Sequence, residues 1–480
     1  MSTIAAVSTP RGKGGIAVIR ISGEDAVGVA ERMFLPKSGK SLAEYGGRQA
    51  VYGDILDSAG NVCDSGICVI FRGPASFTGE DTCEISCHGG TYVTMMVLAS
   101  ALAHGAVPAS AGEFTKRAFI NGRMSLTEAE AVGKLIDSDT EERMRLSSGA
   151  MRGNVSRRIE KIAKSLVNVM TALYAAIDYP DEDIGTEGED EIEGVVNTAL
   201  KDVRQILSTY KTGKAVSDGV KTVICGRPNV GKSSLFNRMT GEDSAIVTSV
   251  AGTTRDILRE SVSFGGVTLR LSDTAGLHES DDEVERIGID RANNEIASAE
   301  LVIAVYTAED CVNGYAPEPL PDCAKIAVIN KSEQYGGEML DKAFTEYLGR
   351  NFNRLVLLSC RDEDPCGGES VVRLKDAFGR EGYRAATGVA GLSDSVAELY
   401  GSDKIDLVND AVIWDVRQQA SLSRAAEWLT QASETLAIGG EIDAVCTSVE
   451  AAAAALSETD GRGITEEIVN GIFHRFCVGK

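Results

Sequence analysis

The clearest chemistry in the chain belongs to residues 226–233, Gly-Arg-Pro-Asn-Val-Gly-Lys-Ser. This spacing is typical of a phosphate-binding loop, whose glycines let backbone N–H groups turn towards phosphate oxygens. Lys232 would reach the β- and γ-phosphates of a nucleotide, and the Ser233 hydroxyl would hold Mg²⁺. The apolar residues 222–225 predict a buried strand before the loop, and residues 235–239 predict the first turn of a helix. The alternative is a glycine loop at an ordinary strand–helix turn, but it does not explain the motifs that follow.

Those later motifs predict a nucleotide switch. Asp273 ends an apolar strand, where its carboxylate can hold Mg²⁺ through water. Thr253 and Thr254 precede that strand, and a threonine there binds metal only while a γ-phosphate is present. Asn330 and Lys331 end another apolar strand, where they could cradle a base. Together the motifs resemble the Ras-like GTPase domain of the translation-factor-related branch, which implies a doubly wound sheet.

This first resemblance implies a broad nucleotide site. The expected GTP-binding residues are Asn229, Val230, Gly231, Lys232, Ser233, Ser234, Thr248, Ser249, Val250, Ala251, Gly252, Thr253, Thr254, Asp273, Thr274, Ala275, Gly276, Asn330, Lys331, Glu333, Ser359, Cys360 and Arg361.

Two positions depart from the Ras-like pattern. Glu333 stands where the pattern has an aspartate that accepts two hydrogen bonds from guanine, so we expect GTP binding with reduced discrimination. Leu277 stands where Ras-like proteins place a water-orienting glutamine, so hydrolysis needs another group. Asn229 could help to hold a monovalent cation near the developing phosphate charge, or it could only stabilise the loop as an Asx turn.

Composition limits the class of protein. A chain of 480 residues predicts two or three domains, and 43% hydrophobic residues are ordinary for a globular protein. No apolar run approaches the ~20 residues of a membrane span. Eleven dispersed cysteines and the absence of a secretory signal pattern predict a cytoplasmic protein. The net charge of −23 argues against nucleic-acid binding by bulk electrostatics, although residues 143–164 are locally basic and form either a solvated helix face or an RNA-facing patch.

Periodicity along the chain predicts a multidomain α/β plus all-α protein. Residues 1–120 mix strands with one helical stretch and predict an N-terminal α/β domain. Residues 121–214 and 381–480 are helical and predict two parts of one helical domain. Between them, residues 215–380 predict the inserted Ras-like P-loop domain with its doubly wound sheet.

The whole chain resembles the MnmE/TrmE family of tRNA-modification GTPases. The matching segments are residues 3–23, 76–90, 112–119, 251–256, 282–288 and the C-terminal residues 476–480. The resemblance implies a GTPase subunit that helps to add an aminomethyl or carboxymethylaminomethyl group to C5 of the wobble uridine. It also implies tRNA, a homodimer, and an FAD-dependent partner of the MnmG/GidA type in a heterotetramer or larger complex.

The same resemblance implies particular cofactors and residues. A tetrahydrofolate, as the 5,10-methylene or 5-formyl derivative, would bind the N-terminal domain at Arg20, Glu84, Arg123 and Lys480. Mg²⁺ would bind Ser233 and Thr254, and K⁺ would bind near Asn229, Thr248, Val250 and Thr253. Glu285 would position the attacking water, with Asn229 as the second catalytic residue, and Cys477 could have a chemical or a structural role. The alternative function is a regulatory GTPase in ribosome assembly, which would leave the folate-type termini unexplained.

Overall fold

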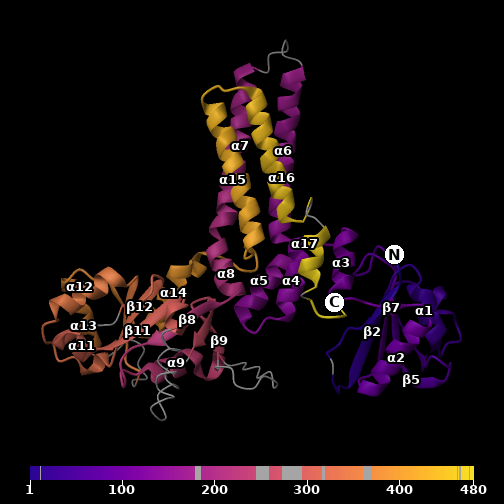
Figure 1. Cartoon of the computed structure of the whole chain (residues 1–480), viewed down its shortest axis with the longest axis horizontal. Coiled ribbons are helices and arrows are strands. Elements are labelled where there is room, and N and C mark those ends of the chain that lie inside the picture. Colours follow the sequence, from indigo (N-terminus) through magenta and orange to yellow (C-terminus); the bar gives the residue numbers. More distant parts are fainter. Residues whose placement is uncertain are drawn as a thin grey trace. The chain divides into compact units, whose positions relative to one another are not determined.

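The computed structural model describes residues 1–10, 12–178, 185–244, 259–272, 294–315, 319–360, 369–461, 463, 466–474 and 476–479. By its internal contacts the chain divides into two compact units (Figure 1). Unit 1 contains Met1–Gly133, Met151–Val167 and Glu450–Lys480, and unit 2 contains Lys134–Ala150 and Asn168–Val449. Each unit is built on one seven-stranded sheet together with helices, which is the α/β plus all-α architecture that the sequence predicted.

The sheet of unit 1 is mostly antiparallel and has the order β3-β4-β5-β6-β2-β1-β7. Only the pairing of β1 with β7 is parallel. Its strands are β1 (Ile4–Val7), β2 (Ile16–Ser22), β3 (Phe34–Pro36), β4 (Gln49–Leu56), β5 (Val62–Phe71), β6 (Thr82–His88) and β7 (Val107–Pro108).

Two helices cover one face of this sheet, α1 (Ala26–Met33) and α2 (Thr91–Ala103). Alternation along β6 directs Cys83, Ile85 and Cys87 into that core, so the cysteines are packing residues. Burial raises the pKa of the Cys87 thiol to about 11. The intervening residues of β6 and β2 face away from the helices, and Arg20 and Glu84 are among them.

The N-terminal region is more helical than the sequence predicted. Instead of one helical stretch in residues 1–120 it contains α1, α2 and α3 (Glu113–Ile120). Two of these, α1 and α3, are only eight residues long, so each offers barely two turns of periodicity to a sequence pattern.

The remaining helices of unit 1 hold the C-terminal end of the chain. They include α4 (Leu126–Ile136), the first part of α6 (Asn154–Asp178), the last part of α16 (Ile442–Thr459) and α17 (Glu466–Phe473). Leu126 and Ala129 of α4 share a small core with Val469 and Phe473 of α17. Phe473 is in turn flanked by Phe119 and Phe476, at centroid distances of 6.3 and 5.3 Å.

The sheet of unit 2 has the order β14-β13-β12-β11-β8-β10-β9, and all its neighbours are parallel except β9 and β10. The strands are β8 (Val220–Cys225), β9 (Arg259–Phe264), β10 (Val267–Ser272), β11 (Leu301–Thr307), β12 (Ala324–Asn330), β13 (Arg354–Leu357) and β14 (Ala385–Thr387). The associated helices are α9 (Lys232–Ser244), α11 (Ala308–Asn313), α12 (Lys342–Asn351), α13 (Glu369–Arg380) and α14 (Gly388–Tyr400). The strand order reverses at β8, because the chain continues to β10 on one side and to β11 on the other. In such sheets ligands bind at the carboxyl end of the strand at which the order reverses.

The helical part of unit 2 includes α5 (Glu141–Met151), α7 (Gly185–Ser208), α8 (Tyr210–Ser217) and α15 (Val416–Ala437). Helices α7 and α15 lie side by side (Figure 1). The basic stretch 143–164 is not a single exposed face, because Arg143 is largely buried and is paired with Asp139. No helix in the described ranges is both long and apolar enough to cross a bilayer.

Candidate functional site

The phosphate-binding loop lies between β8 and α9, at the point where the strand order reverses. Gly226 and Gly231 have φ values of 145° and 101°, which side chains larger than hydrogen disfavour. The ammonium of Lys232 donates to the carbonyl oxygens of Gly226 and Arg227, both at 2.9 Å. Ser233 is exposed in the first turn of α9, so the loop has the expected strand–loop–helix setting.

Asn330 connects this loop to the ends of two other strands. Its side chain is buried, its Nδ2 donates to the carbonyl oxygen of Val230 at 2.8 Å, and its Oδ1 accepts from the Cys360 N–H at 3.1 Å. A Cβ on Gly231 would lie 2.1 Å from Asn330 Nδ2. Gly231 is therefore required by the asparagine packed against it as well as by its own backbone angles.

Glu333 provides the test of whether this edge suits guanine. It lies in the short helix η3 (Ser332–Gln334), directly after Lys331 in the left-handed conformation (φ 55°). Its Oε2 is buried and has no hydrogen-bond partner among the described residues. A buried carboxylate oxygen without a donor is costly, and a guanine ring would offer its N1–H and N2–H groups. The buried oxygen of Glu333 therefore fits the guanine ring that the sequence pattern predicts at this position.

Ser359 and Cys360 follow β13 at the same edge. Because the Cys360 N–H is held by Asn330, the two strand ends that would enclose a base are fixed to each other. Burial raises the pKa of the Cys360 thiol to about 11, so the thiol stays protonated near neutral pH.

Asn229 has an unusual backbone for a residue other than glycine. Its φ is 64°, a left-handed conformation that asparagine tolerates better than most residues. The side chain is exposed, and within the described ranges it makes none of the backbone hydrogen bonds that define an Asx turn. Its amide oxygen is thus available to a ligand at the loop.

Arg227 makes a contact that sequence reasoning missed. Its guanidinium pairs with the buried carboxylate of Asp310 and lies 4.6 Å from the ring centroid of Tyr315. Asp310 also closes a capping box with Thr307 at the start of α11. The capping pattern Thr-x-x-Asp was readable in the sequence, but its long-range partner was not.

Many of the predicted nucleotide and metal ligands lie outside the described residues. They are Thr248, Ser249, Val250, Ala251, Gly252, Thr253, Thr254, Asp273, Thr274, Ala275, Gly276, Glu285 and Arg361, and Lys480 of the expected folate set is outside as well.

In unit 1 the structure brings Arg20 and Glu84 together. They are register partners on β2 and β6, and their side chains pair at 2.8 Å. The Arg20 guanidinium lies 5.2 Å from the Phe77 centroid and 5.5 Å from the Phe114 centroid. Two aromatic rings thus pack against the cation while Glu84 pairs with it, and both side chains stay partly exposed.

Arg123 and the C-terminal tail both belong to unit 1. The Cγ of Arg123 would be 3.1 Å from a Cβ on Gly79, whose neighbour Thr78 hydrogen-bonds Ser22 at the end of β2. Val478 forms a bridge with Ala111, and the Ser8 hydroxyl donates to the Gly479 carbonyl oxygen at 2.9 Å. The exposed Cys477 accepts a backbone hydrogen bond from Gly112.

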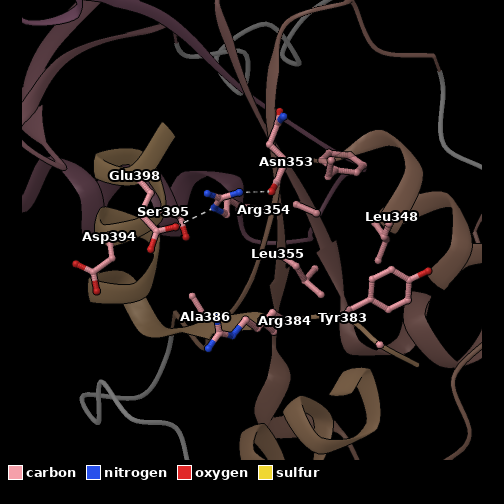
Figure 2. A pocket seen from close by; sticks show the side chains of 15 residues that line it. Leu348, Asn353, Arg354, Leu355, Tyr383, Arg384, Ala386, Asp394, Ser395 and Glu398 are labelled. Atoms are coloured by element: carbon pink, nitrogen blue, oxygen red, sulfur yellow. Dashed lines mark hydrogen bonds and ion pairs between the residues drawn. The ribbon is translucent and has the colours of Figure 1, made fainter. Parts of the chain in front are cut away.

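A pocket of about 720 Å³ lies away from these residues, at the amino ends of β13 and β14 (Figure 2). Arg354 pairs there with Glu398 of α14 at 3.1 Å, and Tyr383 and Arg384 line the same pocket. Because the phosphate-binding loop follows the carboxyl end of β8, this pocket is at the opposite edge of the sheet and is separate from the nucleotide site.

Comparison with known proteins agrees with the geometry of both units. Residues 3–123 match the family model described as the GTP-binding protein TrmE N-terminus, and residues 126–477 match that of the MnmE helical domain. A tRNA modification GTPase MnmE of Symbiobacterium thermophilum is 38% identical over all of this chain and 99% of its own length. Proteins of the same name from Natranaerobius thermophilus and Clostridioides difficile are each 34% identical with the same coverage. The chain therefore belongs to the MnmE/TrmE family of tRNA modification GTPases.

Proposed function

We propose that this chain hydrolyses GTP as one subunit of a complex that modifies C5 of the wobble uridine of tRNA with a (carboxymethyl)aminomethyl group. Two observations carry the nucleotide part: the buried Oε2 of Glu333, which has no partner among the described residues, and the packing of Asn330 against Gly231. The relatives' name, tRNA modification GTPase, supports the tRNA part.

Different residues of this chain would bind the phosphates, the metal ion and the base of the nucleotide. Lys232 would leave the loop carbonyls for the β- and γ-phosphates, and Ser233 with Thr254 would hold Mg²⁺. Asn330, Glu333 and the Cys360 N–H would enclose guanine. The remaining GTP-binding residues of the sequence prediction belong to this proposal.

Hydrolysis would rest on a cation and a carboxylate. Asn229, Thr248, Val250 and Thr253 would hold K⁺, which supplies positive charge next to the transferring phosphoryl group. Glu285 would orient the attacking water in place of the glutamine that Leu277 replaces.

The N-terminal domain would hold the tetrahydrofolate that donates the one-carbon unit. Glu84 can accept from the donor groups of a pterin, while Arg20, Arg123 and Lys480 can pair with carboxylates of the folate glutamate. We place this domain at residues 1–120, the helical domain at 121–214 and 381–480, and the GTPase domain at 215–380. A homodimer that joins an FAD-dependent MnmG/GidA-type partner and tRNA in the cytoplasm completes the proposal.

The nucleotide assignment is tested by competition between nucleotides on the full-length chain. GTP and GDP should displace a fluorescent guanine nucleotide at lower concentrations than ATP does. In Glu333→Gln an acceptor oxygen becomes an amide donor, so guanine affinity should fall by about tenfold or more, equivalent to ~1.4 kcal/mol. Glu338→Gln, five residues further along the chain, is the matched control and should bind normally. Equal affinities for GTP and ATP in the wild type would refute the assignment.

The tRNA role is tested separately in cells that lack the protein. Mass spectrometry of tRNA nucleosides should show loss of the wobble modification, and wild-type protein but not Lys232→Ala should restore it. Intact modification together with defective ribosome assembly would instead favour the regulatory alternative.

A further inference from the structure

Unit 2 contains a small polar cavity that the nucleotide and folate sites do not use. It has a volume of about 180 Å³ and lies between the end of α4, helices α5 and α8, strand β10 and the segment before α15. Trp414 and Leu146 form its apolar wall, and Arg143 and Arg270 are two of its charged lining residues.

The guanidinium of Arg143 is held in place by two of its nitrogens. Nη1 pairs with Asp139, one turn earlier, and Nε donates to the Val216 carbonyl oxygen at 3.2 Å. Its third nitrogen, Nη2, is buried and has no hydrogen-bond partner in the described part of the chain. An ionised N–H group in that state is one of the costlier features that a folded protein can keep.

Arg270 approaches the same place from β10. A Cβ built on Gly219 would lie 3.0 Å from Arg270 Nε and 3.2 Å from Arg143 Nη2, so both nitrogens are within 3.2 Å of one point. No carboxylate of the described residues pairs with Arg270. The guanidinium groups of Arg143 and Arg270 therefore both lie next to Gly219, which has no side chain to fill the space beside them.

The other charged groups around the cavity do not remove this excess at its centre. Lys134 pairs with Asp218 at 3.2 Å, and both side chains are nearly half exposed at the rim. Asp137 also lines the cavity, but it is exposed and pairs with neither guanidinium group among the described contacts. Within the described residues the inner wall thus offers the N–H donors of two arginines, and no carboxylate pairs with Arg270.

We propose that this cavity binds a free inorganic oxyanion of phosphate size, held by Nη2 of Arg143 and the guanidinium of Arg270. An oxyanion would accept from both arginines, relieve their repulsion and satisfy the orphaned Nη2. The volume is too small to enclose a nucleoside. Arg270 lies three residues before Asp273, so the anion would sit on the strand that leads into the nucleotide motifs.

The test uses the two tryptophans of the chain, Trp414 and Trp428. In a full-length Trp428→Phe background, with GDP and Mg²⁺ filling the phosphate-binding loop, Trp414 fluorescence should respond saturably to phosphate at constant ionic strength in KCl. Arg270→Gln should weaken the apparent affinity at least tenfold. Arg384→Gln, an exposed arginine beside β14, several strands away from β10 in the strand order, should leave it unchanged.

Three results would overturn the proposal: no saturable response, an unchanged affinity in Arg270→Gln, or an equal loss in Arg384→Gln. GDP affinity checks that each variant is folded. Gly219→Ala fills the space without removing a charge, although its φ of 74° also strains the backbone, and it should weaken phosphate binding as well. Phenyl phosphate separates the free ion from a phosphate group on a larger molecule. It should bind at least tenfold more weakly than phosphate, and equal binding would refute the free-ion assignment.

Discussion

Glu333 and Gly231 show how single residues determine the nucleotide edge. The glutamate is one of the two positions at which the sequence departs from the Ras-like pattern, yet its Oε2 is buried and can accept a hydrogen bond. The extra methylene group therefore does not place the carboxylate in solvent. Gly231 in turn allows Asn330 to bond the loop at Val230.

Gly231→Ala should disrupt the nucleotide site without unfolding the chain. A Cβ there would lie 2.1 Å from Asn330 Nδ2, so the asparagine must leave its contact with Val230. We expect GDP affinity to fall by about tenfold or more, which corresponds to ~1.4 kcal/mol. Gly382→Ala is the matched control, because Gly382 also has a positive φ but has nothing within 4 Å of its Cβ position. Similar affinities in the two variants would contradict the packing argument.

Asn229 should determine whether hydrolysis depends on K⁺. With K⁺ replaced by Na⁺ at equal ionic strength, the GTPase rate of the wild type should fall by about tenfold or more, a barrier increase of ~1.4 kcal/mol. In Asn229→Ala the rates in the two salts should be nearly equal, while GDP affinity changes by less than about threefold. A wild-type rate that is the same in both salts would rule out the cation role.

Among the elements, α3 is fastened to the loop before β6 by a buried ionic cluster. Arg117 is 5% exposed and donates to Glu80 at 3.1 Å, to Glu113 at 2.9 Å and to the Ser2 carbonyl oxygen at 2.8 Å. Glu80 also accepts from the Ser22 hydroxyl of β2 at 2.9 Å. One side chain thus joins the N-terminus, a strand end and a helix.

Arg117→Met should therefore destabilise unit 1 strongly. The substitution leaves the Glu80 and Glu113 carboxylates largely buried without their cation, and the loss of one partner of a buried pair costs about 3–5 kcal/mol. Urea unfolding should show a clearly lower midpoint. Arg32→Met removes an exposed pair with Asp25 and exposed hydrogen bonds to the His104 carbonyl oxygen, so it should cost clearly less, about 1 kcal/mol. Equal midpoint shifts in the two variants would mean that the cluster contributes little.

The elements also show what sequence reasoning can and cannot reach. Residues 82–88 were predictable as a strand with Cys83, Ile85 and Cys87 on one face, because alternation is a local signal. The setting of the phosphate-binding loop was predictable for the same reason. Arg227 with Asp310, and Arg143 with Arg270, were not, because residues 83 or more positions apart meet only through the strand order and helix packing. The roles of the site residues and the domain bounds stay predictions.

At the scale of the whole molecule, a contact between described residues joins segments that are far apart in the sequence. Gly479 has a φ of 100°, and a Cβ on it would lie 2.1 Å from the Val7 carbonyl oxygen. Its own carbonyl accepts from Ser8. The tail therefore fits against the N-terminal strand only with glycine at this position.

Gly479→Ala should release the tail and with it the adjoining Lys480. We expect faster carboxypeptidase digestion and an affinity for 5-formyl-tetrahydrofolate that is lower by about tenfold, ~1.4 kcal/mol. Gly463→Ala tests the backbone effect alone, since its φ is 80° and nothing lies within 4 Å of its Cβ position. Unchanged folate binding in Gly479→Ala would show that the tail does not contribute to the folate site.

The hydrogen bond from Ser8 to Gly479 spans 471 positions, which has a consequence for how the protein is made. At roughly 5–20 residues per second, the ribosome finishes the tail about 25–95 s after it has made β1. During that time the surface of the N-terminal sheet that later contacts the tail remains exposed. We therefore expect chains truncated before Gly479 to leave this surface exposed to chaperones and proteases.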